Sequence, residues 1–131
     1  MNLVLYFVVA FGSFLAVDAL WLGLVAPKFY KGQIGHLMAE KPNFTAAAVF
    51  YVIFIVGLVY FVLLPAVTNE SWVTALSNGA LFGLVTYATY DLTNLATLKG
   101  WPITMVIVDL TWGIVLSTTV SLLSYVIIQL F

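Results

Sequence analysis

Three aspartates stand inside stretches of sequence that are otherwise almost wholly apolar: Asp18, Asp91 and Asp109. A charged side chain at the centre of a membrane helix opposes insertion by about 2.5 to 3.5 kcal/mol, and such residues usually serve a function. Carboxyl groups there can exchange protons, bind a small cation, or hold an amine or polyol cargo. These aspartates are therefore the candidate binding and protonation site.

Tryptophans follow two of the aspartates at the same spacing. The pattern Asp-x-x-Trp occurs as Asp18 with Trp21 and as Asp109 with Trp112. An indole N–H is a hydrogen-bond donor and a carboxyl oxygen is an acceptor. We therefore expect each of these carboxyls to accept a hydrogen bond from an indole on a neighbouring helix.

The third aspartate has polar neighbours on its own predicted helix. Tyr87, Asp91 and Asn94 lie three or four residues apart and so share one helix face. The nearest lysine in sequence, Lys99, is about 12 Å farther along a continuous helix. Because buried carboxyls without a cation favour the protonated form, we expect one or more aspartates to carry a proton at neutral pH and the group to titrate together.

The elements that carry these residues must lie in a membrane. The chain has 131 residues, of which 64% are apolar and 7% charged, whereas about a quarter of a soluble domain is charged. Four apolar stretches have the roughly 20 residues that a membrane helix needs, at about 3–26, 44–66, 72–95 and 103–128. Their continuous apolarity excludes the alternation of a β-barrel. We predict an all-α, four-transmembrane-helix bundle forming one domain, 1–131.

Prolines and tryptophans support the limits of these stretches. A proline does least harm at a helix end, and tryptophan rings anchor helices at the headgroup level. The residues at the predicted ends are Pro27, Pro42, Pro65, Pro102, Trp72 and Trp101.

Lysines predict the orientation of the bundle. Lys28, Lys31 and Lys41 fall in the first loop and Lys99 in the third. Short loops rich in lysine stay on the cytoplasmic side. Both termini should therefore lie on the outer, periplasmic side.

The helix rise predicts that the three acids meet. Asp18, Asp91 and Asp109 each lie about 10 to 13 Å from the predicted cytoplasmic end of their helix. We therefore expect a polar cluster between the first, third and fourth helices. The second helix has no ionisable acid, lysine or histidine, and beyond Thr45 at its start its polar members are Tyr51 and Tyr60, so it is expected to form a lipid-facing wall.

Small residues at four-residue spacing predict close helix contacts. Gly12 and Gly23 lie on such faces of the first helix, and Gly79 and Gly83 on a face of the third. Glycines at this spacing allow helix backbones to approach closely in a membrane.

The first loop contains His36, with Glu40 one helical turn later. One interpretation is a solvent-exposed pair without further role. The other is that His36 and Glu40 feed protons to the aspartates, because the ordinary pKa of histidine, near 6.5, suits that task.

Several kinds of chemistry are excluded by composition. The chain lacks cysteine and arginine and has one histidine. We therefore expect no catalytic thiol, no metal site and no cofactor, and no nucleic-acid partner, because that would need a basic face. No residue is assigned a catalytic role.

The sequence Tyr-Asp-Leu-Thr-Asn-Leu-Ala-Thr-Leu-Lys-Gly-Trp-Pro at 90–102, followed by Asp109-x-x-Trp112-Gly113, resembles a family of small four-span bacterial membrane proteins of unknown function. The resemblance covers essentially the whole chain. It implies a bacterial inner-membrane location and four helices, and it implies nothing about a substrate.

Three functions fit these residues. The first is a proton- or cation-linked carrier for a small molecule, with a homodimer as the functional unit because four helices provide a narrow path. The second is a non-catalytic scaffold or accessory subunit of a larger membrane complex, in which hydrogen bonds of the polar cluster hold the helices in register. The third is an enzyme that modifies a membrane lipid with a carboxyl pair as acid and base.

Overall fold

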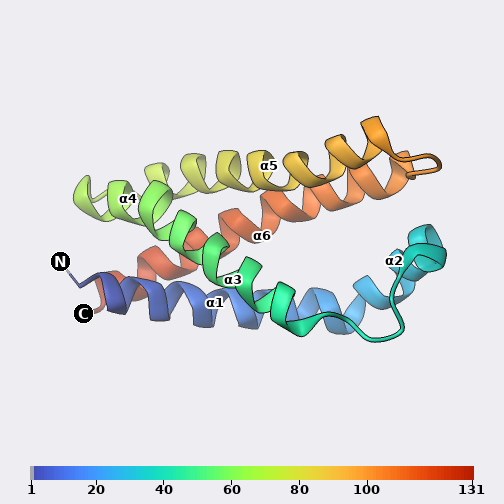
Figure 1. Cartoon of the computed structure of the whole chain (residues 1–131). Helices are drawn as coiled ribbons and strands as arrows, with labels where there is room; N and C mark the ends of the chain where they lie inside the picture. The colour runs from blue at the N-terminus through green and yellow to red at the C-terminus, as the bar shows by residue number, and fades with distance from the viewer. Residues whose placement is uncertain (1) are drawn as a thin grey trace.

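The computed structural model describes residues 2–131, and nearly all of its ordered elements are helices, so the all-α prediction is confirmed. The elements are α1 (Leu3–Leu24), α2 (Ala26–Ile34), a 3-10 turn (Gly35–Leu37), α3 (Phe44–Leu58), a π-helical segment (Val59–Leu63), α4 (Leu64–Thr68), α5 (Trp72–Thr97) and α6 (Ile103–Gln129). Both chain ends lie at one end of the bundle, and α2 lies at the other (Figure 1).

Polar side chains fix where three of the long helices begin. Asn2, Asn43 and Ser71 each accept a hydrogen bond from the backbone N–H three residues later, at 3.0, 3.0 and 3.1 Å. Such a bond satisfies one of the unpaired N–H groups of a helix start. The break between α1 and α2 falls at Val25, just before Pro27, which has no N–H to continue the hydrogen-bond ladder of α1.

Three helical stretches of the described chain are long and apolar enough to cross a membrane: Leu3–Leu24, Phe44–Thr68 and Ile103–Gln129. The fourth predicted crossing would be made by α5, which has 26 residues and so a length of about 39 Å. Its many hydroxyl groups lower its hydropathy. A crossing by α5 stays a prediction.

Pro65 lies one turn inside the second of these stretches instead of at its end. The proline cannot donate to the carbonyl of Phe61, four residues earlier. The side-chain amide of Asn78 on α5 donates to that carbonyl at 3.3 Å, and the π-helical segment spans the same place. A hydrogen bond from the next helix thus compensates for the missing one and lets the helix continue to Thr68.

Glycines bring α5 and α6 together along their length. A Cβ atom on Gly79 would overlap Ser121, and one on Gly83 would overlap the carbonyl of Gly113. Both predicted contacts on α5 are confirmed. A Cβ atom on Gly12 would meet nothing within 4 Å, and the same holds for Gly23, so the prediction of close contacts at these two glycines of α1 is wrong.

Replacing Gly83 by alanine should therefore destabilise the bundle, by about 1 to 3 kcal/mol, because overpacking forces the two backbones apart. The matched control is Gly12→Ala, which adds the same methyl group where space is open. Thermal unfolding in a mild detergent, followed by circular dichroism, measures both. Equal midpoints for the two variants would contradict this account of the α5–α6 contact.

A small apolar cluster holds α2 against the rest of the chain. Trp101 is 7% exposed and packs with Met105 and Val106 of α6, and Phe29 and Tyr30 of α2 pack against them. The prediction that Trp101 anchors its helix at the headgroup level stays a prediction. The buried ring fixes α2 over the cytoplasmic end predicted for the bundle.

Candidate functional site: an acidic and aromatic chamber

A cavity of about 160 Å³ lies among α1, α2, α3, α5 and α6. Two of its lining residues are aspartates, and most of the others are aromatic. The lining consists of Phe14, Asp18, Trp21, Leu22, Tyr30, Tyr51, Tyr87, Asp109 and Trp112. We call this cavity the acidic chamber. It brings together five of the residues predicted for the site, including carboxyls from α1 and α6.

Tyr30 closes the chamber from α2. Its hydroxyl donates a hydrogen bond to Oδ1 of Asp109, and the Trp21 ring lies beside the Tyr30 ring, with centroids 6.3 Å apart. Burial, followed by the hydrogen bond to Asp109 and the charge of Asp109, raises the pKa of Tyr30 far above its ordinary value, and the Trp21 contact acts in the opposite sense. The phenol therefore keeps its proton and remains a donor at physiological pH.

Asp18 faces a tyrosine of the helix that was expected to be only a wall. Asp18 is 8% exposed, and its carboxyl lies close to the Tyr51 hydroxyl of α3, which lines the same cavity. The description of this helix as a lipid-facing wall is therefore wrong at Tyr51. It holds at Tyr60, which is exposed.

Asp91 lies behind the chamber and does not line it. Its side chain is completely buried, and neither carboxyl oxygen has a hydrogen-bond partner of normal geometry within residues 2–131. The Asp91 carboxyl interacts with the Asp109 carboxyl. It also interacts electrostatically with the hydroxyls of Tyr87 and Tyr90. Asp109 therefore both lines the chamber and neighbours Asp91.

The three carboxyls do not form a chelating group: no set of three His, Cys, Asp or Glu side chains in the described chain is placed to hold a metal ion. The lining acids of the chamber are spread over α1 and α6 with aromatic rings between them. This arrangement suits a cation that is larger than a bare metal ion.

The two tryptophans stack on each other. The rings of Trp21 and Trp112 are 4.4 Å apart between centroids and inclined by 8°. In the part of the chain that the structure describes, neither indole hydrogen bonds to an aspartate. The predicted indole–carboxylate bonds are therefore wrong, because the two rings stack on each other where α1 approaches α6.

Three residues predicted for the site lie outside the chamber. Asn94 is partly buried, does not line it, and accepts a hydrogen bond from the Leu98 N–H at its backbone carbonyl, at 2.9 Å. His36 and Glu40 are exposed in the segment after α2. A role for His36 and Glu40 in supplying protons stays a prediction.

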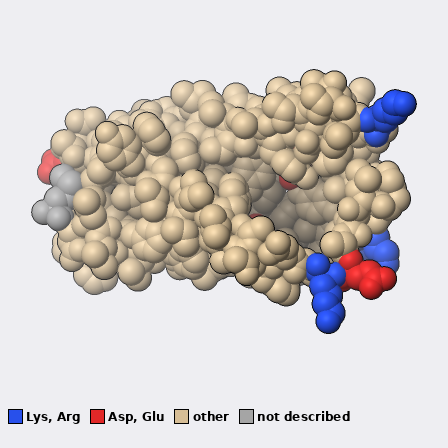
Figure 2. All heavy atoms as spheres, in the orientation of Figure 1, with Lys and Arg blue, Asp and Glu red and all other residues tan. Residues whose placement is uncertain are grey.

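A second, larger cavity of about 520 Å³ lies beside the chamber, on the side of the bundle. It is lined by Phe50, Thr86, Tyr87, Thr89, Tyr90 and Asp109, and we call it the lateral hollow. Because Tyr87 and Asp109 line both cavities, the two are neighbours. Figure 2 shows a hollow on the face toward the viewer, with acidic atoms visible inside it, and the lysines visible in this view lie at the end of the molecule nearer to the hollow.

Removing the phenol hydroxyl in Tyr30→Phe should lower the stability by about 1.5 to 3 kcal/mol, the usual contribution of a hydrogen bond to a charged group. The pKa of Tyr30 is higher in the folded protein than in the unfolded chain. The contribution of Tyr30 to the free energy of unfolding is therefore fully present below the pKa of the unfolded chain, about 10, and decreases as the pH rises above that value. Chemical unfolding of both proteins between pH 7 and about 11 tests this. A stability difference that is constant or grows with pH would contradict it.

Comparison with known protein families gives one match. A family model described as "Predicted membrane protein (DUF2177)" covers residues 3–126. Searches of curated proteins and of solved structures gave no match. The family description agrees with the three apolar helices that can span a membrane. The chain belongs to DUF2177, a family of predicted membrane proteins whose function is unknown.

Proposed function

We propose that this protein is a proton-linked carrier that binds a small organic cation in the acidic chamber. The observation that carries the proposal is the chamber itself: two buried carboxyls from different helices, Asp18 and Asp109, line one cavity that contains no basic side chain. A positively charged ligand would supply the missing partner of these acids. In a low-dielectric interior, an unpaired charge is costly and a counter-ion is strongly favoured.

Asp91 supplies the proton side of the proposal. Two carboxyls next to each other, with no cation near them, favour a state in which they hold one proton between them. Asp91 and Asp109 form such a pair. A cation that enters the chamber would stabilise charged carboxylates in this cluster and favour release of that proton. Binding of the cargo and loss of the proton would then be linked.

The aromatic walls suit an organic cation. Ring faces of tryptophan and tyrosine attract ammonium groups, and this is the usual recognition of quaternary ammonium ligands. Trp21 and Trp112 form one wall of the chamber and Tyr51 contributes to another. A hydrated metal ion would gain nothing from these rings, so they favour an amine or quaternary ammonium cargo.

The proposal includes four membrane crossings in a bacterial inner membrane with both termini outside. In support, α5 packs along α6, and its hydroxyls are internally bonded, as in Thr97 to the Thr93 carbonyl at 2.9 Å. The lysines of α2 and Lys99 lie at the end away from both termini (Figures 1 and 2). Lysine-rich segments stay in the cytoplasm.

The test uses purified protein in liposomes that contain a pH-sensitive dye. A tetramethylammonium gradient should drive a proton flux in the opposite direction, above that of empty liposomes. Tetramethylammonium is a suitable probe because it is small, permanently charged and cannot itself carry a proton. A flux equal to that of empty liposomes would reject the proposed function.

A further inference from the structure

We propose that the cargo is a lipophilic cation that enters sideways from the bilayer between α3 and α5, with its ammonium head in the acidic chamber and its hydrocarbon tail in the lateral hollow. This inference rests on the proposed function and adds to it the class of cargo and its route. It is carried by the positions and linings of the two cavities and by the two residues that they share.

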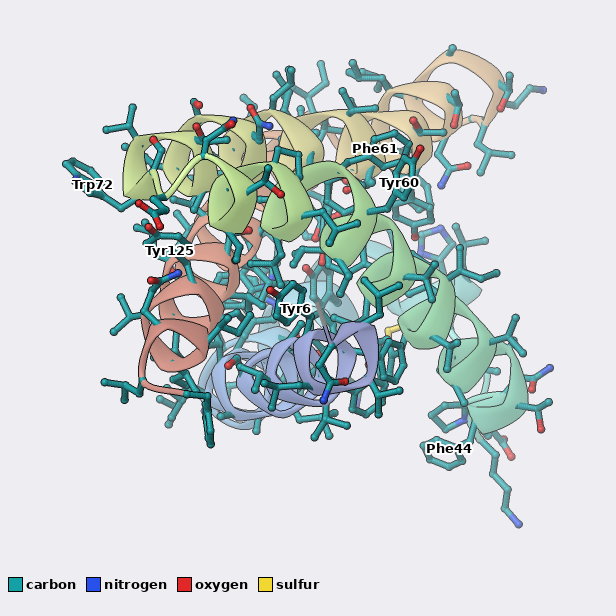
Figure 3. The ribbon with its side chains drawn as sticks, turned by 90° about the vertical axis from the view of Figure 1, so that its left-hand side faces the viewer. Tyr6, Phe44, Tyr60, Phe61, Trp72 and Tyr125 are labelled. Atoms are coloured by element: carbon teal, nitrogen blue, oxygen red, sulfur yellow. The ribbon has the colours of Figure 1, made fainter. Side chains whose placement is uncertain are left out.

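The lateral hollow opens where α3 leans away from the bundle. Figure 3 shows this helix diverging toward its first residue, Phe44, which lies far from the other helices. Phe50, two turns later, lines the hollow and is 46% exposed. The other side is formed by Thr86, Thr89 and Tyr90 of α5. In a membrane, an opening between two helices faces the lipid chains.

The threonines give the hollow an apolar lining despite their hydroxyl groups. The Thr86 hydroxyl donates to the Phe82 carbonyl at 2.8 Å, and the Thr89 hydroxyl donates to the Val85 carbonyl at 2.6 Å. Hydroxyls bonded back to their own helix are satisfied, so they need no water. The two threonine hydroxyls therefore stay paired when hydrocarbon fills the hollow.

The hollow and the chamber together match a molecule with one charged end. Tyr87 and Asp109 border both cavities, so a tail in the hollow and a head in the chamber can belong to one ligand. The hollow has a volume of about 520 Å³, within the range of sites for drug-sized ligands. Neither cavity has a basic residue in its lining, so an anionic or phosphate-bearing lipid head lacks a partner.

Access from the lysine-bearing end is obstructed by α2. Tyr30 of α2 is hydrogen bonded to Asp109, and Phe29 and Tyr30 pack on the cluster around Trp101 and Met105. A ligand arriving from that end would have to separate this packed cluster. The opening between α3 and α5 needs no such rearrangement, which favours the sideways route.

The experiment compares alkyltrimethylammonium ions as inhibitors of tetramethylammonium-driven proton flux in proteoliposomes, with each concentration corrected for measured partition into the lipid. For the unmodified protein, decyltrimethylammonium should inhibit at a concentration about tenfold or more below that of ethyltrimethylammonium, because its tail gains contacts in the hollow. In Thr86→Phe, the added ring occupies the hollow, and this advantage should disappear.

The matched control is Val85→Phe, which adds a ring at the adjacent residue, where the side chain is 54% exposed and does not line the hollow. It should keep the tenfold advantage. If Thr86→Phe does not fold, Thr89→Phe blocks the same hollow from one turn farther along. A chain-length advantage that survives in the blocked variant overturns the inference.

The outcomes separate this inference from the function on which it rests. If tetramethylammonium drives proton flux but the corrected potency does not depend on chain length, the carrier stands and the lipophilic cargo is rejected. If tetramethylammonium drives no flux, the proposed function itself fails. Loss of the long-chain advantage in the tetramethylammonium-driven flux that remains in Thr86→Phe, with that advantage kept in Val85→Phe, supports both.

Discussion

Replacing Asp109 by asparagine should abolish tetramethylammonium-driven proton flux and weaken binding of that cation about a hundredfold. The loss of one partner of a buried charge pair typically costs about 2 to 5 kcal/mol, and a hundredfold change corresponds to about 2.8 kcal/mol. Asp109 carries this effect because it lines both cavities and neighbours Asp91. Asparagine keeps the shape and the acceptor for Tyr30 but has no charge and no acidic proton. Dye-loaded proteoliposomes measure the flux, and fluorescence of the stacked tryptophans measures binding.

The matched control for this variant is Glu70→Gln. It makes the same change from carboxyl to amide, but in the exposed turn between α4 and α5, outside both cavities. Its flux should equal that of the unmodified protein. Flux retained in Asp109→Asn would contradict the assignment of Asp109, whereas flux lost in both variants would show that any loss of charge disables the protein.

Replacing Asp91 by leucine should make the protein more stable while it loses proton coupling. The Asp91 carboxyl is fully buried with both oxygens unpartnered, and removing such a group in favour of an apolar one is expected to gain about 1 to 3 kcal/mol. Without the second acid, Asp109 has no partner with which to share a proton. Cation binding should persist, and proton release per bound cation should fall at least about tenfold.

This variant also discriminates between a carrier and a scaffold. If the polar cluster serves mainly to hold helices together, Asp91→Leu should lower the unfolding temperature in mild detergent. Asp91→Asn serves as the control, because it keeps the side-chain shape while removing the charge. A large loss of stability in both variants would favour the structural interpretation over the carrier.

The meeting of Asp18 and Asp109 in one cavity could be expected from the sequence. Continuous apolar runs give helices of membrane length, and a rise of 1.5 Å per residue then gives the depth of each acid. The two share a depth in the prediction and a cavity in the structure. Depth does not determine the rotation of a helix, and Asp91 shares the depth but lies behind the chamber.

The sequence did not identify Tyr30 and Tyr51 as part of the chamber. Tyr30 contacts Asp109 across 79 positions of sequence, in a segment that was interpreted as a loop, and no local pattern predicts that contact. The signal that could have found α2 is Pro27 at the second position of a short amphipathic segment. Tyr51 was misplaced because its helix is apolar on every side, so periodicity cannot show which face is buried.

Helical spacing alone also could not predict where the Asn94 side chain and the two indole rings lie relative to the chamber. Asn94 shares a face with Asp91, but it lies one turn nearer the helix end and outside the chamber. The spacing of Trp21 and Trp112 from their aspartates permits either a hydrogen bond or a ring stack. The stack depends on side-chain rotamers and on the approach of α1 to α6, neither of which the sequence encodes locally.

Infrared difference spectroscopy on adding tetramethylammonium to the protein in lipid nanodiscs tests the central claim most directly. The account predicts that the band of a protonated carboxyl decreases and that of a carboxylate increases when the cation binds, and that the change is absent in Asp109→Asn and present in Glu70→Gln. An unchanged carboxyl spectrum at a cation concentration that saturates binding would contradict a shared proton displaced by the cargo.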